Sequence, residues 1–253
     1  HPYLSIVAAM AAGIASGFIT AILQTKMGIN SLLAGIIVNT GLYSINIAVM
    51  SGSSILNMNK TDTVFTKMAA LLKGTPVARQ SKLFVAIIAV AAVAVILGLF
   101  LKTRLGLAIR ATGDNPDMVR SSSVNPAFTT IIGLCVANSF TALSGCLLAQ
   151  SQRSVNIDIG TGMVTIALAS LLIGGVFLGR KKMPLRIFGM VLGAFIFRLI
   201  YTIALRFDMP AFMLKFVSSV IVIAAIATPY FKKQLPLLKR RIQTRSGRRK
   251  ADA

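Results

Sequence analysis

The polar segment "GLAIRATGDNPDMVRSSSVNPAF" (residues 106–128) lies between two long apolar runs, Leu83–Leu101 and Phe128–Ala149. As helices, both runs are long enough to cross the hydrocarbon core of a bilayer, which is about 30 Å thick. The segment itself carries charged side chains and the Gly, Asn and Pro residues that begin and end helices. This contrast predicts two membrane spans joined by a structured polar loop, residues 102–127.

The composition of the whole chain agrees with a membrane protein. Its 253 residues are 55% hydrophobic and 13% charged, with a mean hydropathy of +0.79, whereas about a quarter of the residues in soluble domains are charged. The net charge of +21 would favour a nucleic-acid partner, but the cations form short clusters between apolar runs and in the C-terminal tail. We therefore expect no nucleic-acid binding.

The apolar runs predict an all-α, polytopic transmembrane helix bundle of about seven spans. The fifth run has only sixteen residues and is rich in Gly, so it fits a short, broken or tilted element. We expect a transmembrane domain over residues 1–231 and a basic cytoplasmic tail over residues 232–253 that meets anionic lipid headgroups. The seven runs are Tyr3–Gln24, Ser31–Met50, Leu83–Leu101, Phe128–Ala149, Met163–Leu178, Ile187–Leu205 and Ala211–Phe231.

The distribution of Lys and Arg predicts the orientation, because cationic loops stay in the cytoplasm. If residues 102–127 are cytoplasmic, 18 of the 27 cations fall on that side and seven on the other. Five of those seven lie in Ser51–Lys82, where "TDTVFTKMAALLK" (residues 61–73) predicts an interfacial helix with snorkelling lysines. We expect its cap at Thr61 or Thr63 and its apolar face at Val64, Met68, Leu71 and Leu72.

Small residues recur at the spacing that lets helix backbones approach closely in lipid. We interpret these pairs as structural, because the spacing alone is a weak motif in a Gly-rich membrane chain. The pairs are Gly13 with Gly17, Ser170 with Gly174, Gly175 with Gly179, and Gly189 with Gly193.

The first half of the polar loop predicts a short helix. "LAIRAT" (residues 107–112) has helical character, and we expect Gly113 to end it, since Gly adopts the left-handed conformation of a helix end. Arg110 would then project from this helix. An arginine beside a membrane can contact a partner, or it can simply enforce topology.

The second half of the loop predicts another short helix, roughly from Pro116 to Ser122. Asp114 or Asn115 would cap its start, and Pro116 fits the first turn, where its missing N–H costs nothing. Asp117 complements the positive helix end, and the helix presents Arg120. Together the two short helices predict a compact cytoplasmic knob.

This loop resembles the coupling segment of permease subunits of ATP-binding-cassette importers that serve branched-chain amino acids, ribose-type sugars and similar solutes. The family's pattern is close to G-x-A-x-R-A-x-G-x-N-P followed by an apolar helix. "GTGMVTIALASLLIGGVFLGRKKMPLRIFGMVLGAFIF" (residues 160–197) is similar to that family's Gly-rich stretch. The matching loop residues are Gly106, Ala108, Arg110, Ala111, Gly113, Asn115 and Pro116.

The N-terminal 52 residues resemble an amino-acid-type branch often described as uncharacterised or tryptophan-type permeases. Two departures stand out. Ser123 occupies a position where relatives often have Gly, and the family's first one or two helices are absent. Because the chain opens on "HPYLSIV", with neither an initiator Met nor a signal-peptide pattern, we expect it to begin inside a longer protein.

The resemblance implies a multi-pass permease of a prokaryotic plasma membrane that imports an amino acid or a similar small molecule. It would pair with a second permease, copy or paralogue, and receive solute from an extracytoplasmic binding protein. The resemblance also implies two cytoplasmic ATPase subunits that bind ATP and Mg²⁺. This chain has no phosphate-binding loop of the G-x-x-x-x-G-K-[ST] type, which agrees with that division. The residues implied in ATPase coupling are Arg110, Gly113, Asp114, Asn115, Pro116 and Arg120.

Polar residues on the second span are candidates for the solute pathway. Asn39, Tyr43 and Asn46 follow one another at helical spacing and form one stripe, with Thr40 beside them. Polar groups in a span are costly and usually face protein or water. The stripe fits a solute pathway, and it equally fits polar contacts between helices.

Arg198 is the second candidate for the solute pathway. It lies about 18 Å from the cytoplasmic start of its predicted helix, at 1.5 Å per residue. Its guanidinium could attract a solute carboxylate, or it could pair with Asp158 or Asp208 or snorkel to the interface.

Two other classes of function find less support. A secondary transporter commonly relies on buried acidic residues, yet the chain has no Glu and none of its six Asp lies within a predicted span. An intramembrane enzyme would need a nucleophile with a base or a metal cluster, and the sole His is residue 1. We therefore expect neither catalytic residues nor a metal site, nor a cofactor bound by this chain.

Overall fold

A computed structural model describes residues 2–59, 61–71, 80–160, 163–178 and 183–206, with isolated residues between 213 and 227. The chain divides into two compact units, His1–Asp158 and Ile159–Ala253, which we call unit 1 and unit 2. Each unit is described on its own.

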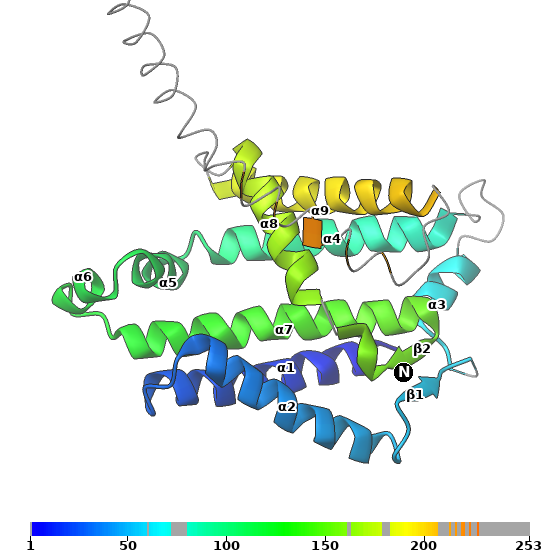
Figure 1. Cartoon of the computed structure of the whole chain (residues 1–253), viewed down its shortest axis with the longest axis horizontal. Coiled ribbons are helices and arrows are strands. Elements are labelled where there is room, and N and C mark those ends of the chain that lie inside the picture. The colour runs from blue at the N-terminus through cyan, green and yellow to red at the C-terminus, as the bar shows by residue number, and fades with distance from the viewer. Residues whose placement is uncertain are drawn as a thin grey trace, which may run out of the picture. The chain divides into compact units, whose positions relative to one another are not determined.

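Unit 1 is built on four long apolar helices: α1 (Pro2–Thr25), α2 (Ser31–Val49), α4 (Ser81–Phe100) and α7 (Pro126–Gln152) (Figure 1). Each is long and apolar enough to cross a membrane. Their bounds agree within a few residues with the first four predicted spans. The prediction of an all-α membrane bundle is therefore confirmed for this unit.

Helices α1 and α7 are in close contact because α1 carries glycines where the two backbones meet. A methyl group on Gly13 would lie 2.5 Å from the carbonyl oxygen of Asn138, and one on Gly17 would lie 2.7 Å from that of Leu134. No side chain fits at either position. The predicted structural role of this pair is confirmed.

The two ends of unit 1 differ in structure. The α1–α2 turn lies at the same end as the short helices α5 (Arg104–Asp114) and α6 (Pro116–Ser121), as alternating spans require (Figure 1). The opposite end carries what we call the distal layer: β1 (Ile55–Asn57), α3 (Val64–Leu71) and β2 (Ser154–Asn156). The two strands, which the sequence did not predict, pair antiparallel with Leu56 opposite Val155.

Helix α3 forms where the sequence predicts it, but a different side chain anchors it. Thr63 is the cap: its hydroxyl accepts from the Thr66 backbone N–H at 3.1 Å, and its own N–H donates to the Thr66 hydroxyl at 2.8 Å. Phe65, absent from the predicted apolar face, is buried. The Lys67 ammonium lies 5.7 Å from the centre of the Tyr3 ring, a cation–π contact that the sequence did not predict.

Unit 2 begins with the short 3₁₀ helix Ile157–Gly160, which crosses the unit boundary, and continues with α8 (Met163–Leu178) and α9 (Met183–Arg206). Helix α9 is long and apolar enough to span a membrane, while α8, with 16 residues, is shorter. The two helices meet backbone to backbone, because a methyl group on Gly174 would collide with the Gly189 carbonyl and one on Gly193 with the Ser170 carbonyl.

Part of the structure predicted for unit 2 lies outside the described residues. Gly175, predicted to pair with Gly179, faces open space, and Gly179 lies outside the described residues. The predicted seventh span, residues 211–231, falls outside them except for isolated positions, and the basic tail, residues 232–253, falls outside entirely.

Candidate functional site

The polar loop folds into α5 and α6, and α5 is longer than predicted. It begins at Arg104, where the Thr103 hydroxyl caps the helix by accepting from the Gly106 N–H at 3.2 Å. It runs through Gly113 to Asp114. The prediction that Gly113 ends this helix is wrong, since the positive-φ glycines among the described residues are Gly28 and Gly52. Gly113 is an ordinary helical position with open space around it.

The junction between the two helices rests on one residue, Asn115. Its backbone N–H donates to the Ala111 carbonyl at 2.9 Å and closes α5. Its side-chain oxygen accepts from the N–H groups of Asp117 and Met118, both at 3.1 Å, and caps α6. Of the two predicted caps, Asn115 is confirmed and Asp114 is not, and Pro116 occupies the first position of α6 as predicted.

The end of α6 is a complete Schellman motif. Ser123 adopts a left-handed conformation with φ of 61°. Its N–H donates to the Arg120 carbonyl at 3.2 Å, and the Val124 N–H donates to the Val119 carbonyl at 3.3 Å. This conformation suits Gly best, which gives a physical reason for the Gly that resembling sequences often place here.

Three contacts fix α5 to the long spans of unit 1, and α6 lies against α7 as well. Gly106 packs against the last turn of α4, where a side chain would collide with the Phe100 carbonyl. The hydroxyls of Thr112 and Thr129 are hydrogen-bonded at 2.8 Å, and Thr129 on α7 is only 2% exposed. Ile109 lies against Gly133 of α7. The pair α5–α6 is therefore held by both α4 and α7, and we call it the coupling module after the role that the resemblance predicts for it.

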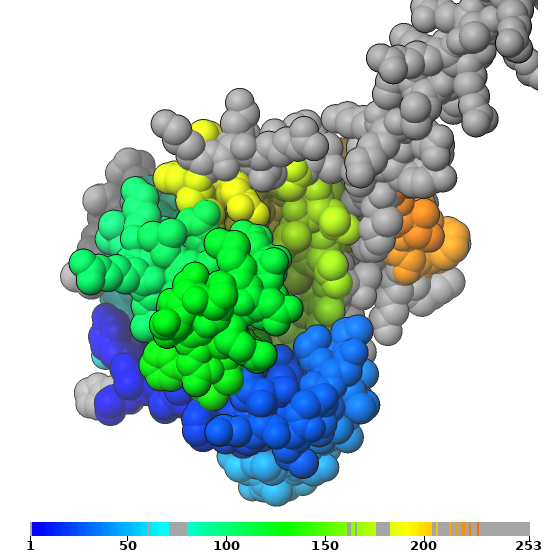
Figure 2. Space-filling view, turned by 90° about the vertical axis from the view of Figure 1, so that its left-hand side faces the viewer, coloured from blue at the N-terminus to red at the C-terminus, as the bar shows by residue number. Residues whose placement is uncertain are grey.

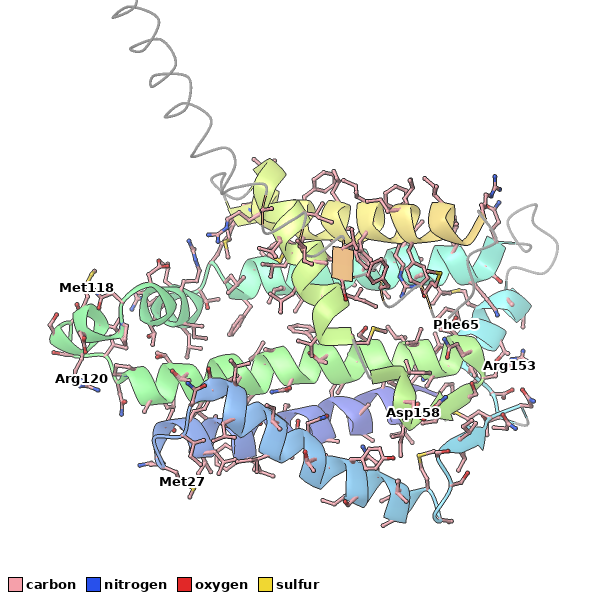
Figure 3. All side chains as sticks on the ribbon, in the orientation of Figure 1. Met27, Phe65, Met118, Arg120, Arg153 and Asp158 are labelled. Carbon is pink, nitrogen blue, oxygen red and sulfur yellow. The ribbon has the colours of Figure 1, made fainter. Side chains whose placement is uncertain are left out.

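The outer surface of the coupling module is solvent-exposed. Met118 and Arg120 lie at its tip, far from the distal layer (Figure 3), and Met118 is 64% exposed. Figure 2 views this end of unit 1, where the green atoms of α5 and α6 project beside the blue atoms of α1 and α2. All of the predicted coupling residues are exposed there: Arg110, Gly113, Asp114, Asn115, Pro116 and Arg120.

The predicted stripe on α2 is exposed within unit 1. Helix α2 contacts α1, with Ala34 buried, while most of its length is uncovered. The side chains of Asn39, Tyr43 and Asn46 are exposed, and they form no hydrogen bond within the part of the chain that the structure describes. Thr40, beside them, donates to its own helix at the Ile36 carbonyl, 2.8 Å away.

Arg198 lies on α9 in unit 2 and is exposed. The preceding residue, Phe197, is 1% exposed and stacks on Tyr201 with ring centres 6.5 Å apart. Arg198 therefore points away from the packed side of its helix. Of its two predicted partners, Asp208 lies outside the described residues, and Asp158 is exposed at the end of unit 1.

Sequence reasoning missed three polar residues that join segments of unit 1. Thr112 and Thr129 read as ordinary helical residues, because a threonine in a span can satisfy its hydroxyl on its own helix. Gln150 lies just beyond the predicted end of the fourth span, yet it is only 3% exposed. The sequence offered one signal for Gln150: it is a polar residue that directly follows an apolar run.

Comparison with known proteins places these features in a family. Residues 1–226 match the family described as branched-chain amino acid transport system / permease component. The chain is 31% identical over 227 residues to a tyrosine transport system permease protein of Clostridioides difficile, covering 90% of this chain and 73% of that protein. No solved structure matches.

Two further relatives are more distant. An uncharacterised protein of Rickettsia prowazekii is 29% identical over 170 residues, which cover 67% of this chain and 57% of that protein. An autoinducer 2 import system permease protein of Yersinia enterocolitica is 24% identical over 224 residues, covering 88% and 59%. Because the family model matches residues 1–226, the chain belongs to the branched-chain amino acid transport system permease family and is a multi-pass plasma-membrane permease of the ATP-binding-cassette importer type.

Proposed function

We propose that this chain forms part of the solute pathway of an importer and couples that pathway to separate ATPase subunits through α5–α6. The observation that carries the proposal is the coupling module itself. It is capped at Thr103 and Asn115, closed at Ser123, and attached to both α4 and α7. A loop that served only as a topology anchor would need its charges but not these contacts.

Rigidity is the property that coupling requires. A nucleotide-driven displacement reaches the spans only if the loop does not deform first. The Thr112–Thr129 hydrogen bond and the contact of Gly106 with α4 resist such deformation on two sides. The partner ATPases would bind ATP and Mg²⁺ and carry out the hydrolysis.

The surface offered to the ATPase combines charge with an apolar side chain. Arg110 and Arg120 are exposed, and arginines are frequent anchors of protein interfaces. Met118, exposed at the tip with Arg120, offers a flexible apolar side chain that adapts to a groove. We infer that the partner presents a groove with an apolar floor and acidic or carbonyl groups at its rim.

We further propose an amino acid as the solute. The tyrosine permease relative supports this class. The amide and hydroxyl groups of Asn39, Tyr43 and Asn46 can hydrogen-bond an ammonium or a carboxylate, and Arg198 can pair with the carboxylate. An extracytoplasmic binding protein would deliver the solute, and a second permease, copy or paralogue, would complete the pathway in the lipid bilayer.

Charge reversal at the coupling module tests the proposal. In the complete transporter, Arg120→Glu should lower ATPase affinity about tenfold or more, because an interface arginine replaced by an acid loses its partner and meets repulsion. Arg153→Glu, the same change at the opposite end of unit 1 (Figure 3), is the matched control. The readouts are co-purification with the ATPase and solute-stimulated hydrolysis in reconstituted vesicles. Equal behaviour of the two variants would reject the coupling role.

Arg198→Gln tests the solute class separately. If Arg198 binds a carboxylate, this variant should lose uptake of labelled tyrosine while ATPase binding and basal hydrolysis stay normal. Loss of the assembled complex would instead identify Arg198 as a structural residue.

A further inference from the structure

The strongest unexplained feature of unit 1 is the buried amide of Gln150, near the distal end of α7. Its Oε1 accepts from the Val64 backbone N–H at 3.0 Å, and its Nε2 donates to the Ser5 hydroxyl at 3.1 Å and to the Pro2 carbonyl at 3.5 Å. One side chain thus joins α7 to the first turns of α3 and α1, segments 86 and 145 residues away from it in the sequence.

The chemistry of the partners fixes the orientation of this amide. A backbone N–H can only donate and a backbone carbonyl can only accept, so Oε1 must face Val64 and Nε2 must face Pro2. The Ser5 hydroxyl completes the network by donating to the same Pro2 carbonyl at 2.8 Å. The side chain of glutamine has the acceptor and the donor that these partners need. An ionised glutamate lacks the donor, and leucine lacks both.

The Val64 N–H has no partner within its own helix. It belongs to the first turn of α3, where N–H groups lack carbonyls four residues earlier in the helix. The Thr63 hydroxyl accepts a hydrogen bond from the Thr66 N–H, and the Thr63 carbonyl accepts one from the Lys67 N–H. Gln150 satisfies the Val64 N–H, so α7 supplies part of the cap of α3.

Helix α7 connects this network to the coupling module. It runs without interruption from Pro126 to Gln152, and Thr129 and Gln150 are separated by about 30 Å along its axis at 1.5 Å per residue. Between these ends, Gly13 and Gly17 hold α1 against α7 at backbone distance. Figure 1 shows α5 and α6 at one end of α7 and the distal layer at the other.

A second attachment lies beside Gln150. The Met58 N–H donates to the Arg153 carbonyl at 2.8 Å, and β1 pairs with β2 directly after α7. The chain segment that precedes α3 is therefore tied to the same end of α7. Gln150 adds a contact with α3 itself, made through a buried side chain.

We propose that Gln150 is a positioning residue that fixes the first turns of α3 and α1 to α7. Displacement of the coupling module at one end of α7 then carries the distal layer at the other end as one rigid body. This inference rests on the proposed coupling function for the source of the displacement. It assigns the transmission to α7, and the attachment of α3 within the distal layer to one glutamine.

Two substitutions break the attachment from opposite sides. Gln150→Leu removes both hydrogen-bonding groups and keeps most of the volume. Val64→Pro removes the backbone N–H that donates to the Oε1 of Gln150. Proline is well tolerated at the first position of a helix. Gln152→Leu is the matched control, because Gln152 is exposed two residues further along α7.

The first measurement is amide hydrogen exchange over residues 61–71 in the purified full-length permease. Gln150→Leu and Val64→Pro should each raise the exchange rate of α3 about tenfold, as expected when a buried hydrogen bond is lost. Gln152→Leu should leave it unchanged. Unchanged exchange in both test variants would overturn the proposal. This arm needs no ATPase, so it remains decisive even if the proposed coupling function fails.

The second measurement follows movement in the complex with the ATPase. Spin labels at Ala70→Cys on α3 and Ala137→Cys on α7, both exposed positions, are placed in a background with Cys135→Ala and Cys146→Ser. With Gln150 intact, the distance between the labels should stay the same when a non-hydrolysable ATP analogue is added. In Gln150→Leu the distribution should broaden or shift with nucleotide. A nucleotide-dependent distance with Gln150 intact, or an invariant one in the variant, would contradict rigid transmission.

Discussion

The hydroxyl oxygens of Thr112 on α5 and Thr129 on α7 lie 2.8 Å apart. Each hydroxyl also contacts a carbonyl of its own helix: Ala108 for Thr112 and Pro126 for Thr129, at 2.8 and 2.9 Å. The pair links the first helix of the coupling module to the longest helix of unit 1, where Thr129 is buried and Thr112 half-buried. The proposed transmission to α7 depends most directly on this contact.

Thr112→Val or Thr129→Val should weaken that contact by about 1 kcal/mol, the net value of one hydrogen bond. Because both substitutions remove the same bond, the double variant should lose less than the sum of the two single losses. The loss is measured by thermal unfolding of the purified permease and by exchange of residues 104–114. Thr130→Val is the control, since its hydroxyl bonds only the Pro126 carbonyl of its own helix. Additive losses would show that the two hydroxyls act independently.

Ser123→Gly should stabilise the coupling module. A non-glycine residue pays about 1 kcal/mol or more in the left-handed conformation that Ser123 holds at φ of 61°. Part of this gain is lost to the greater freedom of Gly in the unfolded chain, so a gain of about 0.5 kcal/mol is expected. Ser122→Gly, at φ of −88°, should give no gain. The comparison is made by exchange protection of residues 116–121, and a larger gain at Ser122 would disprove the argument.

The sequence predicted the positions of the long helices α1, α2, α4, α7 and α9 well, because long apolar runs specify where a span lies almost without reference to tertiary contacts. Asn115 and Pro116 were also predictable, since a capping side chain and a first-turn proline act within their own helix. Gly113 was mispredicted for a related reason: a glycine near a helix end resembles a stop, although Asn115, two residues on, closes α5 instead.

Contacts between distant segments were not predictable. The β1–β2 pair is three residues long on each side and carries no strand pattern that stands out beside the spans. Phe65 was overlooked although it lies three residues before Met68 and so borders the predicted apolar face. Gln150 and Thr129 gain their importance only when the fold buries them beside groups far away in the chain. The coupling and pathway residues chosen from sequence remain proposals, since exposure alone does not identify a partner.

Gly174 and Gly175 on α8 offer a sharp comparison of packing. A methyl group on Gly174 would collide with the Gly189 carbonyl on α9, whereas one on Gly175 would meet nothing within 4 Å. Gly174→Ala should destabilise the α8–α9 pair by about 1–3 kcal/mol, the usual cost of overpacking. Gly175→Ala should be neutral or stabilise by up to about 1 kcal/mol, since Ala favours helices. Thermal unfolding in one detergent ranks the two variants, and equal effects would refute the close contact.

Substitutions in the polar stripe of α2 can distinguish a role in the solute pathway from a role in helix contacts. Asn39 and Asn46 are exposed within unit 1, so replacing them removes no hydrogen bond from the described part of that unit. An amide facing lipid is unfavourable, which means that water, solute or a partner must cover this stripe. If solute passes there, Asn39→Leu with Asn46→Leu should slow uptake of labelled tyrosine about tenfold, the value of roughly one lost hydrogen bond to a charged group. Assembly and thermal stability should stay at the level of Thr40→Val, the neighbouring control whose hydroxyl bonds only its own helix. If the stripe is instead a contact between permease subunits, the double variant should lower the stability of the assembled pair while the surviving complexes transport at the normal rate.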